Sequence, residues 1–138
     1  MPMSVYIAED DSEDYLILEE ALIELLPGIS LRWSRNGEDL INQLSIKDNM
    51  LPHLIILDND MPKLNGMETL LRLNQIVQFQ PVPKVIYSSG SSQVYKEKAL
   101  LAGALGYFQK GNSYPQVLSD VKQMLSFGSK ILSPSVHH

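Results

Sequence analysis

Short apolar runs alternate with segments of helical periodicity along most of this 138-residue chain. The expected strands are residues 5–8, 29–34, 54–57, 85–87 and 107–108. The expected helices are residues 13–26, 37–46, 67–77, 93–102 and 114–126. Strict alternation of five strands with five helices predicts an α/β fold with a parallel sheet and helices on both faces, because parallel strands need long crossover connections.

The uniformly apolar run at residues 54–57 is typical of a central strand that is buried on both faces. Ser12 is a natural N-cap for the first helix, and Pro27-Gly28 ends that helix. From Gly128 onward we expect a loosely ordered tail. The sequence therefore predicts one domain over residues 1–127, followed by a C-terminal tail over residues 128–138.

Charge is distributed unevenly, although the whole chain carries a net charge of only −5. Residues 1–60 hold 13 acids and 3 bases, whereas residues 61–138 hold 3 acids and 8 bases. An acidic front half argues against direct nucleic-acid binding, which needs a basic surface to displace counterions. Cysteine is absent, which excludes disulfides, thiolate zinc sites and cysteine nucleophiles. With no signal-peptide pattern and no long apolar run, we expect a cytoplasmic protein without a membrane segment.

Polar residues follow four of the five expected strands. They are Glu9, Asp10 and Asp11, then Asp58, Asn59 and Asp60, then Ser88 and Ser89, and finally Lys110. Because the carboxyl ends of parallel strands meet at one edge, where ligands bind, we expect these residues to form one cleft. Converging carboxylates raise one another's pKa unless a cation relieves the repulsion, and oxygen ligands suit Mg²⁺.

Asp58 ends the most apolar run and is the candidate nucleophile, because an aspartate carboxylate can form an acyl phosphate. Lys110 supplies a positive charge, and Ser88 supplies a hydroxyl donor. A cation, an ammonium and a hydroxyl around one carboxylate are the parts of a phosphoryl-transfer site. Catalysis at such a site consists mostly of positioning and charge neutralisation.

Four motifs at the ends of the strands carry a family resemblance. They are Glu9-Asp10, Leu-Asp-x-x-Met-Pro at residues 57–62 with Gly66 following, Ser88-Ser89, and Gly-Tyr-x-x-Lys at residues 106–110. Because the four motifs occur in this order, the chain resembles the receiver domain of two-component response regulators from residue 4 to about residue 126. The resemblance implies a CheY-like, flavodoxin-like, doubly wound sheet of (βα)5 form with strand order 2-1-3-4-5, of the single-domain type.

The resemblance also implies a metal site and a phosphoacceptor. Asp58 would accept a phosphoryl group from a sensor histidine kinase or a histidine phosphotransfer protein. Mg²⁺ would be ligated by Asp10, Asp58 and the backbone carbonyl of Asp60, and Glu9 would hold a metal-bound water.

The remaining roles that the resemblance implies concern the switch. Lys110 and Ser88 would contact the phosphoryl oxygens, and Ser88 with Tyr107 would change a protein-binding surface for an unknown downstream target. Such a domain catalyses only its own phosphorylation and dephosphorylation, so it is not an enzyme in the ordinary sense. A phosphorylation-dependent homodimer is a further arrangement known in the family.

Three positions depart from the family pattern. Glu9 stands where Asp is commoner, and the extra methylene group alters the expected metal geometry. Gly111 follows Lys110 where the family usually has Pro, so the characteristic cis peptide is not expected and the loop should be more mobile. Asp60 adds a second acid two residues after Asp58, which should alter metal affinity or the rate of hydrolysis.

Other interpretations stay open at this point. Asp11, Glu13 and Asp14 read as charges that favour a helix N-terminus, and Trp33 is assigned no chemistry. The apolar strand followed by Asp-x-Asp at residues 55–60 also fits a haloacid-dehalogenase-type phosphatase, although that family places the motif in its first strand. A degenerate receiver that acts only by protein binding is a third interpretation.

Overall fold

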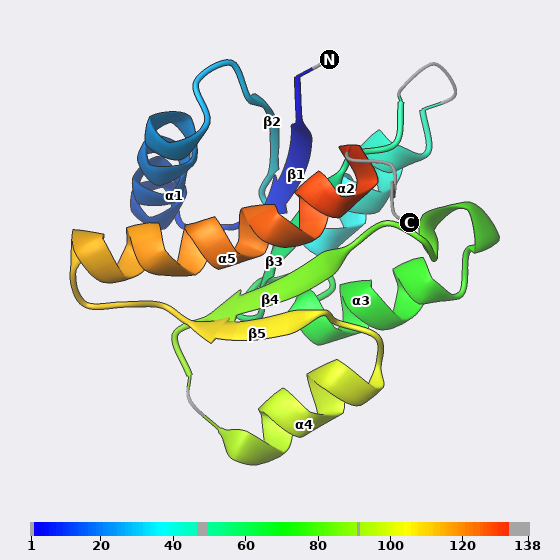
Figure 1. The fold of residues 1–138 in the computed structure, drawn as a ribbon. Helices are drawn as coiled ribbons and strands as arrows, with labels where there is room; N and C mark the ends of the chain where they lie inside the picture. The colour runs from blue at the N-terminus through cyan, green and yellow to red at the C-terminus, as the bar shows by residue number, and fades with distance from the viewer. Residues whose placement is uncertain (1, 47–49, 91, 133–138) are drawn as a thin grey trace, which may run out of the picture.

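The computed structural model describes residues 2–46, 50–90 and 92–132, and its strands form a five-stranded parallel sheet (Figure 1). The strands are β1 (Ser4–Ala8), β2 (Ser30–Ser34), β3 (Leu54–Asp58), β4 (Lys84–Ser88) and β5 (Gly106–Gln109). The helices are α1 (Ser12–Leu25), α2 (Gly37–Leu44), α3 (Gly66–Asn74), α4 (Gln93–Leu101) and α5 (Tyr114–Leu132), with a 3-10 turn η1 (Val77–Phe79). The strand order is β2-β1-β3-β4-β5, which confirms the predicted fold class and topology.

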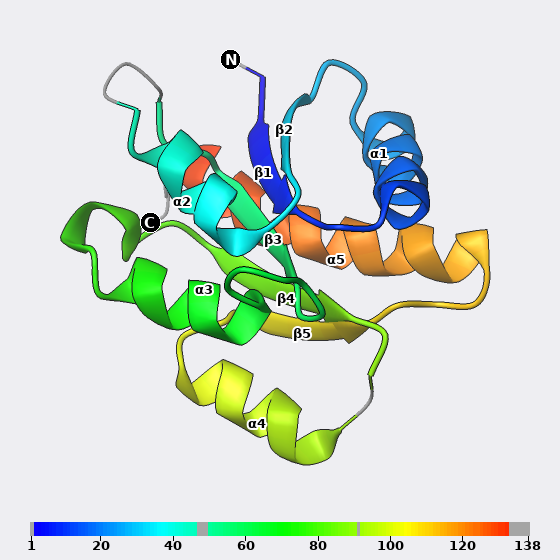
Figure 2. The ribbon, with the colours of Figure 1, turned by 180° about the vertical axis from the view of Figure 1, so that it is seen from behind.

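Helices cover both faces of the sheet, as Figures 1 and 2 show from opposite sides. Alternate residues of β1 supply the two cores: Val5 and Ile7 pack with α1 and α5, whereas Tyr6 and Ala8 pack with α2, α3 and α4. All five residues of β3 are buried, because β3 lies between β1 and β4 with helices on each face. The prediction of a central, doubly buried strand is confirmed.

Parallel pairing brings the carboxyl ends of the strands to one edge of the sheet. Asp58 pairs in register with Tyr87, and Ser88 pairs with Gln109. The segments that follow β1, β3, β4 and β5 therefore start side by side. This edge, called the carboxyl edge below, holds the residues that the sequence places in one cleft.

The first helix begins differently from the prediction. Asp11, not Ser12, is the N-cap of α1, and its Oδ1 accepts hydrogen bonds from the backbone N–H groups of Glu13 at 2.9 Å and Asp14 at 3.1 Å. A carboxylate satisfies two unpaired amides here and also favours the positive end of the helix dipole.

The last helix extends beyond its predicted end at residue 126 and runs to Leu132. Gly128 lies within α5 and does not stop it. A Cβ at this position would lie 3.2 Å from the carbonyl oxygen of His53 and 3.3 Å from Sδ of Met3. Gly128 therefore allows α5 to pack closely against the sheet, and the expected loose tail is wrong for residues 128–132. Residues 133–138 lie outside the described part of the chain.

Among the described segments, none of the helices is both long enough and apolar enough to cross a membrane.

Candidate functional site

Asp58 is the last residue of β3 and is only 3% exposed. The loop that follows it folds back closely, and the backbone N–H of Asp60 donates to Oδ1 of Asp58 at 3.3 Å. A Cβ at Gly66 would lie 2.6 Å from the carbonyl oxygen of Asp58. Glycine is therefore needed where α3 begins, because any larger residue would push this loop away from Asp58.

Three carboxylates converge at the carboxyl edge. Glu9 and Asp10 follow β1, and one oxygen from each of Glu9, Asp10 and Asp58 lies within 4.8 Å of the other two. We call these three residues the acidic cluster. Glu9 is buried and Asp10 is exposed, so the cluster opens to solvent on the Asp10 side. The structure thus brings together the acids that the sequence selects from two separate loops.

Asp60 lies beside the cluster, but its side chain is directed elsewhere. Ser89 donates a hydrogen bond from its Oγ to Oδ2 of Asp60 at 3.1 Å. This contact joins the loop after β3 to the loop after β4. The sequence places both residues at this edge, but no spacing in it indicates that they are paired.

Lys110 reaches the cluster from the end of β5 and binds three carboxylates. Its Nζ lies 2.8 Å from Oε1 of Glu9, 2.8 Å from Oδ2 of Asp14 and 3.3 Å from Oδ1 of Asp58. The contacts with Glu9 and Asp58 agree with the predicted site. The contact with Asp14 was not predicted. The only sequence signal for it is the position of Asp14 in the first turn of α1, the helix that starts at this edge.

The electrostatics of the cluster show an excess of negative charge. Burial raises the pKa of Glu9 to about 8, with a hydrogen bond to Asp58 acting in the same direction and Lys110 opposing it. Burial and the charge of Asp58 also raise the pKa of Asp10. For Lys110, burial acts to lower the pKa, but Asp14, Glu9 and Asp58 together outweigh it and raise the pKa.

One ammonium does not neutralise the acidic cluster, which therefore favours a bound proton or a second cation. The donor set consists of carboxylate oxygens, which are the ligands that Mg²⁺ prefers. The residues present thus fit a magnesium ion, and a bound cation would oppose the rise in the pKa of Glu9, because it favours the ionised carboxylate.

The two predicted switch residues meet at Gly90. Ser88 is buried, and its Oγ accepts a hydrogen bond from the Gly90 N–H at 3.1 Å. Tyr107 is half-buried, and its hydroxyl donates to the Gly90 carbonyl at 3.3 Å. One backbone unit of the loop after β4 therefore connects Ser88 with Tyr107.

Two aromatic contacts support the site and were not predicted. Trp33 donates from its indole Nε1 to the carbonyl oxygen of Glu9 at 2.7 Å, and its ring stacks on Tyr15 with a centroid separation of 4.1 Å. The Tyr95 hydroxyl donates to Oδ1 of Asn59 at 2.7 Å. Trp33 therefore holds the backbone of the acidic cluster, and Tyr95 ties α4 to the residue after Asp58.

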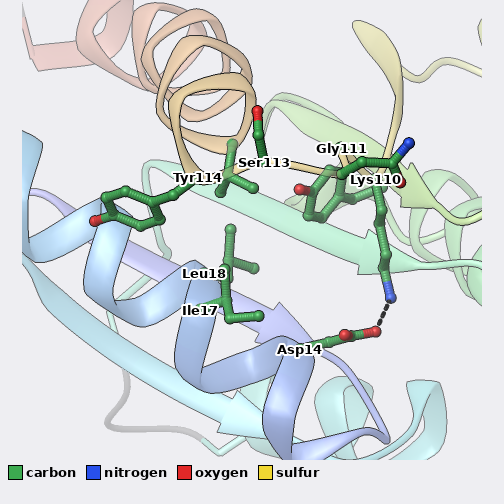
Figure 3. A pocket seen from close by; sticks show the side chains of 10 residues that line it. Asp14, Ile17, Leu18, Lys110, Gly111, Ser113 and Tyr114 are labelled. Carbon is green, nitrogen blue, oxygen red and sulfur yellow. Dashed lines mark hydrogen bonds and ion pairs between the residues drawn. The ribbon is translucent and has the colours of Figure 1, made fainter.

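The loop after Lys110 contains the unusual Gly111, and its peptide bonds are trans, as are all those in the described segments. This agrees with the expectation from the sequence. A pocket with a volume of about 210 Å³ lies beside this loop, between α1 and the start of α5 (Figure 3). Its lining includes Asp14, Ile17, Leu18, Lys110, Tyr114 and Val117.

The family model of the response regulator receiver domain matches residues 5–122, which is most of the chain. Together with the strand order and the site at the carboxyl edge, this match identifies the protein as a member of the response regulator receiver domain family of two-component signalling. Members of this family are regulatory domains and not free-standing catalysts. The phosphatase interpretation is not favoured, because Asp58 ends the third strand in chain order and not the first.

Individual relatives agree with this assignment. Transcriptional activator protein ExaE of Pseudomonas putida is 31% identical over 133 residues, which is 96% of this chain and 59% of ExaE. The crystal structure of the phosphorylated cyanobacterial phytochrome response regulator RcpA matches with a TM-score of 0.86 and 21% identity, covering 98% of this chain and 100% of RcpA. The Mn²⁺-bound form of response regulator Rcp1 matches with a TM-score of 0.80 and 22% identity, covering 91% and 94% of the two chains. The two structural likenesses show the fold.

Proposed function

We propose that this receiver accepts a phosphoryl group on Asp58. The observation that carries the proposal is the position of the Asp58 carboxylate: it is buried, 3.3 Å from the Lys110 ammonium, and grouped with Glu9 and Asp10. A carboxylate placed in this way has a positive group beside it and oxygen ligands for a divalent cation next to it. The ammonium, and a cation held by these ligands, reduce the repulsion that an anionic phosphoryl donor meets.

The donor is a phosphohistidine on a sensor histidine kinase or a histidine phosphotransfer protein. One oxygen of the Asp58 carboxylate attacks the phosphorus, an acyl phosphate bond forms, and the P–N bond to the imidazole breaks. The leaving imidazole keeps the bonding electron pair and takes a proton from solvent. Lys110 orients and neutralises the phosphoryl oxygens through its ammonium.

Mg²⁺ is the proposed cofactor, and when bound it supplies positive charge beside the transferring phosphoryl group. Asp10 and Asp58 would hold it directly, the backbone carbonyl of Asp60 would be a third ligand, and Glu9 would hold a metal-bound water. The convergence of Glu9, Asp10 and Asp58 supports this set. The Mn²⁺-bound form of Rcp1 supports a divalent cation in a protein of this fold.

The output is a change in a protein-binding surface. Phosphorylation replaces the single negative charge of the Asp58 carboxylate by about two negative charges on the phosphoryl oxygens, and Ser88 is a hydroxyl donor close to that edge. If the Ser88 hydroxyl turns toward the phosphoryl group, it gives up its contact with Gly90, which also holds Tyr107. The downstream target, a phosphorylation-dependent homodimer and the cytoplasmic location remain predictions. Gel filtration with and without beryllofluoride, a phosphoryl mimic, tests the dimer.

Acetyl phosphate labelling tests the proposed function. We expect the wild-type protein with Mg²⁺ to gain the mass of one phosphoryl group, and Asp58→Asn to gain none. Asp60→Asn is the matched control, because it makes the same chemical change two residues away and should still be labelled, with a changed phosphoryl half-life. Wild-type protein that stays unlabelled, while its Mg²⁺ site is occupied, would favour the degenerate receiver. Turnover of a small phosphate ester would favour the phosphatase.

A further inference from the structure

The Lys110 ammonium has three N–H groups and three carboxylate partners. Glu9 and Asp14 each lie 2.8 Å from Nζ, whereas Asp58 lies 3.3 Å away. The proposed phosphoacceptor is therefore the most distant of the three partners. Two other carboxylates hold the ammonium to one side of Asp58.

Asp14 differs from Glu9 in its exposure to solvent. The Asp14 side chain is 41% exposed, and that of Glu9 is 3% exposed. Figure 3 shows Asp14 extending from α1 toward Lys110, which comes from the end of β5, beside the pocket between α1 and α5. A carboxylate in this position regains water when an ion pair breaks, so its pairing is weak and reversible.

The local structure of α1 does not require an acid at residue 14. Asp11 already caps the helix through two backbone N–H groups, and Glu13 supplies another negative charge to the first turn. The contact of Asp14 with Lys110 links residues 96 positions apart. The feature that distinguishes Asp14 from its neighbours in α1 is therefore the long-range contact with Lys110.

We propose that Asp14 is a positioning residue for Lys110, drawing the ammonium away from Asp58 until a phosphoryl group replaces it as a partner. The inference rests on the proposed function. The phosphoryl oxygens carry about two negative charges, and they compete with Asp14 for one N–H of Lys110. Glu9 is buried and cannot be released to water, so Asp14 is the partner that Lys110 leaves. The strength of the Asp14–Lys110 ion pair therefore opposes phosphoryl binding.

The affinity for beryllofluoride at saturating Mg²⁺ measures this competition. We expect Asp14→Asn to bind the mimic about two- to fivefold more tightly, the range for a partly exposed ion pair. Glu13→Gln is the matched control, because it removes one negative charge from the same helical turn, and we expect it to bind as the wild type does. Mg²⁺ affinity is measured separately for each variant. If Asp14 had only a structural role, Asp14→Asn would not bind beryllofluoride more tightly.

Repeating the substitution without the Lys110 charge makes the test specific. In a Lys110→Gln background, Asp14→Asn should give no gain in affinity. Three results would overturn the inference if Asp58 is still labelled. They are an equal gain in beryllofluoride affinity in the Lys110→Gln background, an equal gain in Glu13→Gln, and no gain in Asp14→Asn. Wild-type protein that is neither labelled at Asp58 nor bound by beryllofluoride would instead overturn the proposed function, and the inference with it.

Discussion

Two lysines, Lys84 buried and Lys110 half-buried, lie at opposite ends of the strands and are bound in different ways. Lys84 begins β4, and its Nζ donates to the backbone carbonyls of Phe79 at 2.7 Å, Val82 at 2.8 Å and Gln80 at 3.3 Å. Lys110 follows β5 and binds three carboxylates. One lysine is surrounded by neutral dipoles, and the other by full negative charges.

The difference sets the charge state and the role of each lysine. Burial lowers the pKa of Lys84 to about 8, whereas for Lys110 the three acids outweigh burial and raise the pKa. The partners of Lys84 lie within five residues of it, so it fastens one local turn. The Glu9 partner of Lys110 lies 101 residues away, so Lys110 joins distant segments at the proposed site. The role of each lysine therefore depends on its partners.

The largest effect on stability is expected at Lys84. Replacing it by Met keeps the apolar stem but removes the donor to three backbone carbonyls, of which that of Phe79 keeps only the Val82 N–H at 3.3 Å. We expect Lys84→Met to lower the free energy of unfolding by about 3 kcal/mol in urea denaturation. Lys96 is exposed, and Lys96→Met should change stability by less than about 0.5 kcal/mol. Equal effects in the two variants would show that the carbonyl contacts of Lys84 contribute little.

Replacing Lys110 by Met should lower stability less than Lys84→Met does, and the size of this effect should depend on whether Mg²⁺ is present. The acidic cluster would lose its positive partner, and we expect unfolding in a chelator to require about 1–2 kcal/mol less than in the wild type. Mg²⁺ should restore most of this loss, because it supplies the missing positive charge. It should restore none of the loss in Lys84→Met. Stability of Lys110→Met that does not respond to Mg²⁺ would argue against a metal site at the acidic cluster.

The contrast between the two lysines also shows what could be predicted from the sequence. Alternating apolar runs and helical periodicity predicted the sheet, because each run must be buried between helices. The position of Asp58, Glu9, Asp10 and Lys110 at one edge of the sheet followed from parallel topology. Which of these residues are neighbours depends on the order of the strands, which the family resemblance implied.

Contacts that depend on side-chain direction could not be predicted. The sequence shows Lys84 as one more basic residue, because its burial depends on how η1 turns back over the start of β4. The hydrogen bond from Trp33 to the Glu9 carbonyl depends on the register of β2 beside β1. Gly128 was predicted to begin the C-terminal tail. Its role in the packing of α5 depends on how closely this helix approaches the sheet, which only the structure shows. These three features each depend on a contact between elements and not on the type of an element.

A third prediction uses the lowered pKa of Lys84. Its ordinary pKa is 10.5 and its pKa in the folded protein is about 8, so between these values the unfolded chain binds more protons. Stability therefore rises with pH in this window. We expect the wild type to gain about 1 kcal/mol relative to Lys84→Met between pH 8 and 9. Parallel pH profiles of the two proteins in urea denaturation would contradict the lowered pKa.

The smallest effect is expected at Trp33, which supports the acidic cluster from outside. Trp33→Phe keeps a ring that can stack on Tyr15 but removes the donor to the Glu9 carbonyl. We expect Mg²⁺ affinity, measured by calorimetry, to fall about threefold, in line with the loss of one neutral hydrogen bond. Tyr95→Phe is the matched control: it removes a hydroxyl that contacts Asn59 and should leave Mg²⁺ affinity unchanged. Equal losses in both variants would mean that the metal site responds to any loosening of the carboxyl edge, and not to the backbone of Glu9 in particular.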